Sequence, residues 1–170
     1  RLKEILIEAV RQRMIADVPI GTFLSGGIDS TLVTAIAQSM SGKKINTYSI
    51  GFYEKQYDES VYAEDISKYI GTNHHRFMVS ERDMFQLIDD LPRYYDEPFS
   101  DSSQLPTMIV SKLASQDITA ALTGDGGDEL FCGYAGYDNI LRMQKYKRIA
   151  KLIGPISKSN FIQQKIPSRF

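Results

Sequence analysis

The stretch FLSGGIDST, residues 23–31, joins a strand-like apolar run to the helical run TLVTAIAQSM, residues 31–40. Only a serine and two glycines separate the two patterns. Glycines let the backbone turn into the left-handed region and approach a ligand closely. The start of the following helix offers unpaired N–H groups and the positive end of its dipole. With the hydroxyls of Ser25 and Ser30, this turn predicts a phosphate-binding site.

The rest of the chain alternates strand and helix patterns. Strand-like runs lie at about 19–24, 45–52, 74–79 and 118–123, and helical patterns lie between them at about 30–40, 58–70, 81–91 and 103–115. A further helix at the N-terminus should end before Pro19. Asp58 and the box Ser80-x-x-Asp83 are typical helix starts. This alternation predicts an α/β fold with a parallel sheet flanked by helices.

A second glycine-rich turn follows the last strand pattern, in ALTGDGGDELF, residues 121–131. It places Asp125, Asp128 and Glu129 in one short segment, where their mutual repulsion requires a compensating cation. Mg²⁺ binds one or two carboxylates together with substrate phosphates. We expect Asp29 and Asp128 to share it. The alternative is two ordinary Gly-Asp turns with capping carboxylates; two such turns at strand ends of one sheet favour the functional interpretation.

Two commoner phosphate-binding motifs are excluded. The pattern GxxxxGK[ST] requires a lysine that the first turn lacks, and in the second turn Glu129 stands where GxGxxG needs its third glycine.

Composition narrows the class of protein. The 170 residues carry a net charge of −1 and one cysteine, Cys132. A single cysteine excludes a disulfide framework and fits a reducing, cytoplasmic location. We interpret Cys132 as a small buried hydrophobe. No run reaches the roughly 18 apolar residues of a membrane span. Residues 139–170 contain eight Lys or Arg and no acidic residue. Because no aromatic stacking pattern accompanies this run, we interpret it as a solvated helix face, not a nucleic-acid surface.

The two turns together resemble the synthetase domain of the asparagine synthetase family, in the ATP-pyrophosphatase (PP-loop) group. The likeness runs from Asp17 to Tyr137 and rests on the segments VPIGTFLSGGIDS, TYSIGF, YIGTNHHRF, DEPFSDSSQLPT and LTGDGGDELFCGY. It implies a Rossmann-like, adenine nucleotide alpha-hydrolase architecture. Residues 1–150 would form an incomplete ATP-pyrophosphatase domain, and residues 151–170 would begin a C-terminal helical part. A glutaminase domain should precede Arg1.

The resemblance also implies roles for single residues. It places Phe23 and Leu24 beside the nucleotide, Ile50 against adenine, and Thr123 and Gly124 at the ribose and α-phosphate. The pyrophosphate would be held by Ser25, Gly26, Gly27, Asp29 and Ser30, and Mg²⁺ by Asp29 and Asp128.

The implied reaction is ATP cleavage between the α- and β-phosphates, giving an acyl-adenylate, β-aspartyl-AMP, that ammonia attacks to form asparagine. Asp125 is the catalytic candidate. Well-studied members have Glu-Gly-Ser where this chain has Asp125-Gly126-Gly127, which withdraws the carboxylate by one methylene, roughly 1.5 Å. We expect these 170 residues alone not to make asparagine.

Other functions stay open. The acceptor could be a sugar acid, a peptide or a β-lactam precursor; the chain could be a non-catalytic nucleotide-binding module; or it could be a tRNA-modifying thiolase, which would want a CxxC or a basic face. The ammonia source and the oligomeric state, a homodimer included, are also open.

Three further motifs have simpler interpretations. The pair His74-His75 lacks the Cys or third His of a metal site. The segment DEPFSDSS, residues 96–103, is typical of helix capping, although the resemblance keeps Asp96, Asp101 and Ser102 as acceptor-site candidates. Tyr134 and Tyr137 are expected to pack.

Overall fold

The computed structural model describes residues 1–56, 58–97, 100–134, 136, 137, 139, 140, 142 and 143. The chain divides into two compact units, Arg1–Asp125 and a second unit that begins at Gly126. The basic run predicted to be a solvated helix face lies almost wholly outside the described residues.

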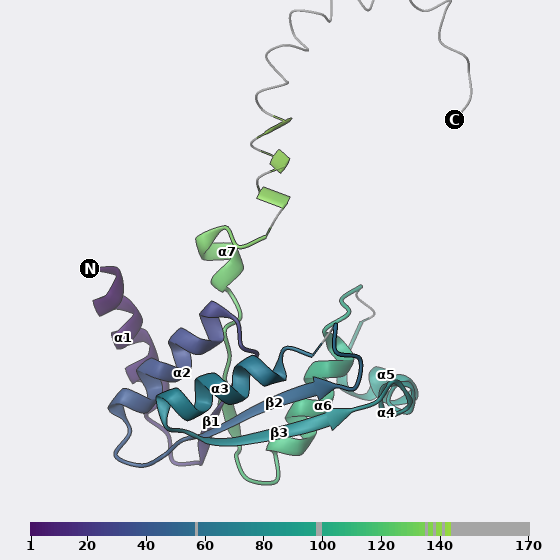
Figure 1. Cartoon of the computed structure of the whole chain (residues 1–170), viewed down its shortest axis with the longest axis horizontal. Coiled ribbons are helices and arrows are strands. Elements are labelled where there is room, and N and C mark those ends of the chain that lie inside the picture. The colour runs from purple at the N-terminus through teal and green to yellow at the C-terminus, as the bar shows by residue number, and fades with distance from the viewer. Residues whose placement is uncertain (57, 98–99, 135, 138, 141, 144–170) are drawn as a thin grey trace, which may run out of the picture. The chain divides into compact units, whose positions relative to one another are not determined.

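The first unit is built on a four-stranded parallel sheet (Figure 1). Its strands are β1 (Ile20–Phe23), β2 (Asn46–Phe52), β3 (Asn73–Val79) and β4 (Ala120–Leu122), in the order β3-β2-β1-β4. This confirms the predicted α/β fold with a parallel sheet.

Strand order determines where a ligand can bind. From β1 the chain proceeds outward through β2 to β3, and then returns to place β4 on the other side of β1. Adjacent β1 and β4 are paired from Ile20↔Ala120 to Thr22↔Leu122, so their carboxyl ends lie side by side. Ligands of open parallel sheets bind at such a reversal of strand order. The two glycine-rich turns follow these two strands.

Helices cover both faces of the sheet (Figure 1). α1 (Leu2–Arg13), α2 (Ile28–Met40) and α3 (Ser60–Ile70) lie on one face, and α6 (Gln104–Ala114) lies on the other. On the α6 side the core consists of Tyr48, Val110, Ala114 and Ile118; on the α1–α2 side it consists of Val10, Ala37 and Ile45. Buried Thr22 and Thr34 join β1 to α2 through hydroxyl groups 2.9 Å apart.

One predicted helix is wrong. Instead of one helix over 81–91, the structure has α4 (Glu81–Phe85), a 3₁₀ turn η1 (Ile88–Asp90) and α5 (Leu91–Tyr94). The predicted capping box forms: Ser80 accepts from the Asp83 N–H, and the Asp83 carboxylate accepts from the Ser80 N–H. Pro92, in the first turn of α5, has no N–H to offer the preceding turn and its ring obstructs a continuous helix.

The second unit begins with the short helix α7 (Gly127–Phe131). Cys132 ends this helix in the left-handed conformation, with φ of 59°. Its side chain is exposed, so the expectation of a buried hydrophobe is wrong. The reason is that a helix of five residues buries none of its own side chains here.

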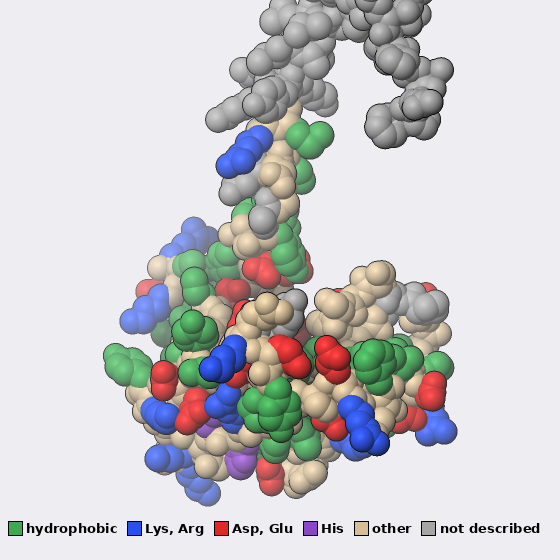
Figure 2. All heavy atoms as spheres, turned by 45° about the vertical axis from the view of Figure 1, so that its right-hand side comes forward, with side chains coloured by type: hydrophobic (Ala, Val, Ile, Leu, Met, Phe, Trp, Pro, Cys, Tyr) green, Lys and Arg blue, Asp and Glu red, His purple; other side chains and the backbone are tan. Residues whose placement is uncertain are grey.

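In the described part of the chain, no helix combines the length and the apolar character required to cross a membrane. On the face of the first unit in Figure 2, acidic and basic side chains are interspersed and form no broad basic surface.

Candidate functional site

The glycine loop, residues 24–27, connects β1 to α2 and has a fixed shape. Its first residue, Leu24, is buried, and its N–H donates to the Tyr48 carbonyl at 2.9 Å, which extends the pairing of β1 with β2. Gly26 then has φ of 89°, a conformation that side chains disfavour. The predicted role for glycine in this turn therefore has a physical basis.

Hydroxyl groups hold the loop from inside. Ser25 N–H donates to Ser30 Oγ at 3.2 Å, and the two serine hydroxyls lie 2.9 Å apart. Gly27 N–H donates to Ser25 Oγ at 3.3 Å, and Thr31 Oγ1 donates to the Gly27 carbonyl at 2.6 Å. Ser30 is buried whereas Ser25 is exposed. Ser30 thus orders the loop, and Ser25 is the hydroxyl that a ligand can reach.

The start of α2 is suited to an anion. Helix ends leave their first N–H groups without intrahelical partners, and in the described part of the chain no side chain caps this helix at Gly27. The helix dipole adds partial positive charge there. Half-buried Asp29, in the first turn, opposes an anion by itself and would favour a cation alongside it.

A third element borders the glycine loop. A Cβ placed on Gly26 would lie 3.1 Å from the Glu59 carbonyl oxygen, 3.1 Å from Tyr62 Cβ and 3.3 Å from the Ala63 nitrogen. The loop backbone is therefore packed directly on the first turn of α3. No pattern in the sequence indicates this contact, because the two segments meet only through the strand order.

The second loop, residues 123–126, approaches the same helix end. A Cβ placed on Gly124 would lie 2.7 Å from the Ser30 nitrogen and 3.1 Å from Asp29 Cβ. The structure thus brings together predicted site residues that are distant in sequence: Asp29 and Ser30 from one loop, and Gly124 from the other. Their approach is so close that it requires glycine at position 124.

The catalytic candidate is oriented within this second loop. Thr123 Oγ1 donates to Asp125 Oδ2 at 2.9 Å, and the Asp125 N–H donates back to Thr123 Oγ1 at 3.3 Å. The carboxylate is exposed, so a substrate group can reach it. A hydroxyl that is held in this way has its proton committed to Asp125 and offers a ligand only its remaining lone pair.

Two of the three predicted apolar contacts of the nucleotide lie on the α6 face of the sheet, while the third, Leu24, is fully buried. Phe23, at the end of β1, and Ile50, in β2, are half-buried and pack against the core around Tyr48. Burial and the neighbouring Asp117 carboxylate, which accepts from the Tyr48 hydroxyl at 3.2 Å, raise the pKa of Tyr48 to about 12. Tyr48 is therefore a packing residue in its neutral form.

Asp128 belongs to the second unit. Its carboxylate lies against Gly133, where any Cβ would collide with it. Nearby, the Tyr134 hydroxyl donates to Glu129 at 2.6 Å, which raises the Tyr134 pKa to about 12, and the Tyr134 ring lies 5.9 Å from that of Tyr137. Among the described residues, no three His, Cys, Asp or Glu side chains gather into a metal-binding group. The pairing of Asp128 with Asp29 stays a prediction.

The other candidates make local contacts. Asp101 accepts from the Ser103 N–H at 2.8 Å, just before α6, while Asp96 and Ser102 are exposed. The ring nitrogens of His74 lie 2.8 Å from Thr47 Oγ1 and 3.1 Å from Ser49 Oγ. Burial holds the pKa of His74 below its usual value.

Comparison with known proteins identifies the family of the chain. The chain matches the sequence model of the family described as "Asparagine synthase" over residues 1–168. It is 43% identical over 152 residues to a putative glutamine-hydrolyzing asparagine synthetase 2 of Methanocaldococcus jannaschii, covering 89% of this chain and 29% of that protein. It is 30% identical over 148 residues to the glutamine-hydrolyzing asparagine synthetase 1 of Bacillus subtilis, covering 87% and 23%. The chain thus spans less than a third of either relative.

Solved structures share the fold at lower identity. An NH3-dependent NAD synthetase from Campylobacter jejuni superposes with a TM-score of 0.52 and 12% identity, over 78% of this chain and 59% of that one. A glutamine-dependent NAD+ synthetase from Acinetobacter baumannii, in complex with ADP, gives 0.50 and 17%, over 76% and 26%. These likenesses confirm the predicted adenine nucleotide alpha-hydrolase architecture.

Proposed function

The chain belongs to the asparagine synthase family, and from this premise we propose that it forms the ATP-binding part of an amide ligase. Its two loops would hold ATP while a carboxylate is activated and then attacked by ammonia. The observation that carries the proposal is the contact of Gly124 with the Ser30 nitrogen, which joins the two loops at the start of α2.

ATP would lie with its phosphates over the glycine loop. The N–H groups at the start of α2 and the Ser25 hydroxyl are the donors, and Gly26 and Gly27 leave the backbone accessible. Phe23 and Leu24 would lie beside the nucleotide, Ile50 would flank the adenine, and Thr123 and Gly124 would border the ribose and α-phosphate. Neither loop contains a lysine of the kind that assists γ-phosphate transfer. A cradle of N–H groups suits a departing pyrophosphate.

The carboxylates fit a divalent cation. Asp29 is half-buried, and among the described residues it has no Lys or Arg partner. We propose that Asp29 and Asp128 hold Mg²⁺, which when bound would offset the charge of the pyrophosphate. Gly124 of the second loop packs directly against Asp29, since a Cβ at position 124 would lie 3.1 Å from Asp29 Cβ.

The reaction would proceed in two steps. An oxygen of the substrate carboxylate attacks the α-phosphorus of ATP, and pyrophosphate leaves, giving an acyl-adenylate. Ammonia then attacks the acyl carbon, and AMP leaves with the electron pair of the broken C–O bond. Asp125, whose carboxylate accepts a hydrogen bond from Thr123, would take a proton from the attacking nitrogen. Holding the reactants in line would supply most of the acceleration.

We propose aspartate as the carboxylate substrate, because the relatives are asparagine synthetases by name. Ammonia would come from a glutaminase domain of the whole protein. The shorter side chain of Asp125, compared with Glu, makes another small carboxylate the second candidate.

The test is pyrophosphate release by the intact protein with ATP, Mg²⁺, ammonium and either aspartate or another carboxylate. Release that depends on aspartate, with asparagine and AMP as products, is expected. Release of ADP and phosphate instead, or no binding of ATP by the intact protein, would contradict the proposal.

A further inference from the structure

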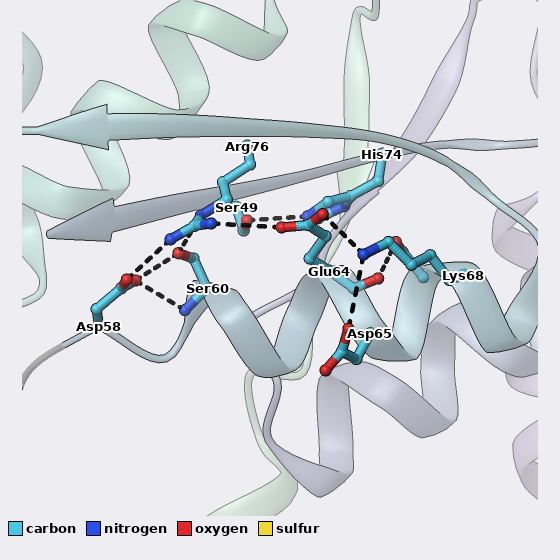
Figure 3. A network of polar contacts seen from close by, with 9 residues as sticks. Ser49, Asp58, Ser60, Glu64, Asp65, Lys68, His74 and Arg76 are labelled. Atoms are coloured by element: carbon cyan, nitrogen blue, oxygen red, sulfur yellow. Dashed lines mark hydrogen bonds and ion pairs between the residues drawn. The ribbon is translucent and has the colours of Figure 1, made fainter. Parts of the chain in front are cut away.

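A chain of polar contacts runs from strand β3 to the start of α3 (Figure 3). The Arg76 guanidinium donates to Asp58 Oδ2 at 2.8 Å, to Ser60 Oγ at 2.6 Å and to Glu64 Oε2 at 3.3 Å. Asp58 Oδ1 in turn accepts from the Ser60 N–H at 3.1 Å and from the Ser60 hydroxyl. One guanidinium thus binds both the segment that leads into the helix and the first two turns of the helix.

This network is largely withdrawn from water. The Asp58 side chain is 10% exposed and the Arg76 side chain 28% exposed. Beneath them β2 has Gly51, where a Cβ would collide with Ser60 Oγ and lie 2.9 Å from Asp58 Oδ1. The carboxylate therefore lies against the bare backbone of β2. Removing one partner of such a pair leaves a poorly solvated charge and disturbs its surroundings.

The same turn of α3 is what the glycine loop packs on. Gly26 lies against the Glu59 carbonyl, Tyr62 Cβ and the Ala63 nitrogen, where a Cβ would be crowded at 3.1–3.3 Å. The first turn is thus held between Arg76 on the sheet side and Gly26 on the loop side. A shift of this turn would displace the loop backbone, because close-packed groups transmit strain.

We propose that Arg76 is a positioning residue for the glycine loop. By fixing the first turn of α3 through Asp58 and Ser60, it sets where the backbone of Gly26 lies. The expected effect of Arg76 on ATP binding rests on the function proposed above. The effect of Arg76 on the position of Gly26 does not. If Arg76 only stabilised the fold, its replacement would lower the free energy of unfolding without changing the local stability of the glycine loop.

The chain offers a matched control in the same helix. Lys68, in the last turn of α3, also binds Glu64, at 2.8 Å, and it binds Asp65 at 3.6 Å. It shares an ion-pair partner with Arg76 but lies at the helix end away from Gly26. Replacing Lys68 therefore removes an ion pair from α3 without releasing its first turn.

The first experiment measures amide hydrogen exchange over residues 23–31 in the intact protein without nucleotide. Arg76→Gln should accelerate exchange in this segment about tenfold, as expected for a loop that loses local stability. Lys68→Gln should leave it at the wild-type rate. Equal exchange in the two variants would overturn the inference, whether or not the protein binds ATP.

The second experiment measures ATP binding by the same proteins under conditions where all are folded. Arg76→Gln should weaken binding about tenfold, because a displaced loop would lose about one hydrogen bond from its N–H groups to the phosphates. Arg76→Lys should rescue part of this loss, because lysine restores the charge but not the planar fork. Unchanged binding in Arg76→Gln would contradict the proposal.

The two experiments separate the two proposals. If wild-type protein fails to bind ATP while loop exchange still depends on Arg76, the proposed function fails and the positioning role stands. If Arg76→Gln does not fold, Arg76→Lys and Asp58→Asn are measured in its place. Wild-type exchange over residues 23–31 in both would overturn the inference.

Discussion

Gly124→Ala tests the contact that joins the two loops. The added Cβ would lie 2.7 Å from the Ser30 nitrogen, whereas ordinary contacts begin at 3.4 Å. The loops must therefore separate by about 0.3–0.7 Å, which restores a distance of 3.0–3.4 Å, since the Ser30 nitrogen is a backbone atom and cannot rotate away. Gly124 does not have a positive φ, so crowding alone acts at this position.

The expected cost has two parts. Overpacking at a tight contact lowers the free energy of unfolding by about 1–3 kcal/mol. Separation of the loops also misaligns ATP and the Asp125 carboxylate, which should lower kcat/KM by about tenfold to a hundredfold. Both effects are measured on the intact protein, by urea denaturation and by pyrophosphate release.

Gly42→Ala is the matched control, because a Cβ at Gly42 meets no atom within 4 Å and Gly42 has no positive φ. It should change the free energy of unfolding by no more than about 1 kcal/mol, in the stabilising direction. Gly124→Ala that is as stable and as active as Gly42→Ala would refute the close approach of the loops.

Two other predictions follow from the carboxylates. In the intact protein, Asp29→Asn and Asp128→Asn should each lower Mg²⁺-dependent turnover by orders of magnitude. The thermal unfolding temperature of both variants should stay near that of wild type. Near-normal Mg²⁺ dependence in both variants would show that the two aspartates are not metal ligands. The Ser60 hydrogen bonds and, less strongly, the Arg76 charge hold the pKa of Asp58 below its usual 3.8. A lowered carboxyl pKa stabilises the fold above the usual value, and the stabilisation is lost as the pH falls through the lowered one. Acid unfolding followed by circular dichroism below about pH 4 should therefore be steeper for wild type than for Asp58→Asn; identical slopes would contradict this.

The sequence by itself determined the fold class and the two loops. Apolar periodicity and glycine punctuation are local signals, and both survive folding because strands and helices form from neighbouring residues. The turn at Gly26 was recognisable for this reason, as was the capping box at Ser80. The same local signals failed where a single residue interrupts a pattern. Pro92 lies just after the expected helix over 81–91, and its missing N–H and its ring disrupt the last turn, which becomes η1.

Only the tertiary structure decided which segments meet. Gly124 reaches Ser30 because β4 pairs with β1, and no residue pattern records that pairing. Arg76 reaches Asp58 and Ser60 because the register of β3 on β2 aligns Arg76 with Ser49, beneath the start of α3. The physical reason is that strand order and register depend on burying the apolar faces of the strands against the core, which involves residues far apart in the sequence. A loop's own residues determine its shape, but the fold determines what it contacts.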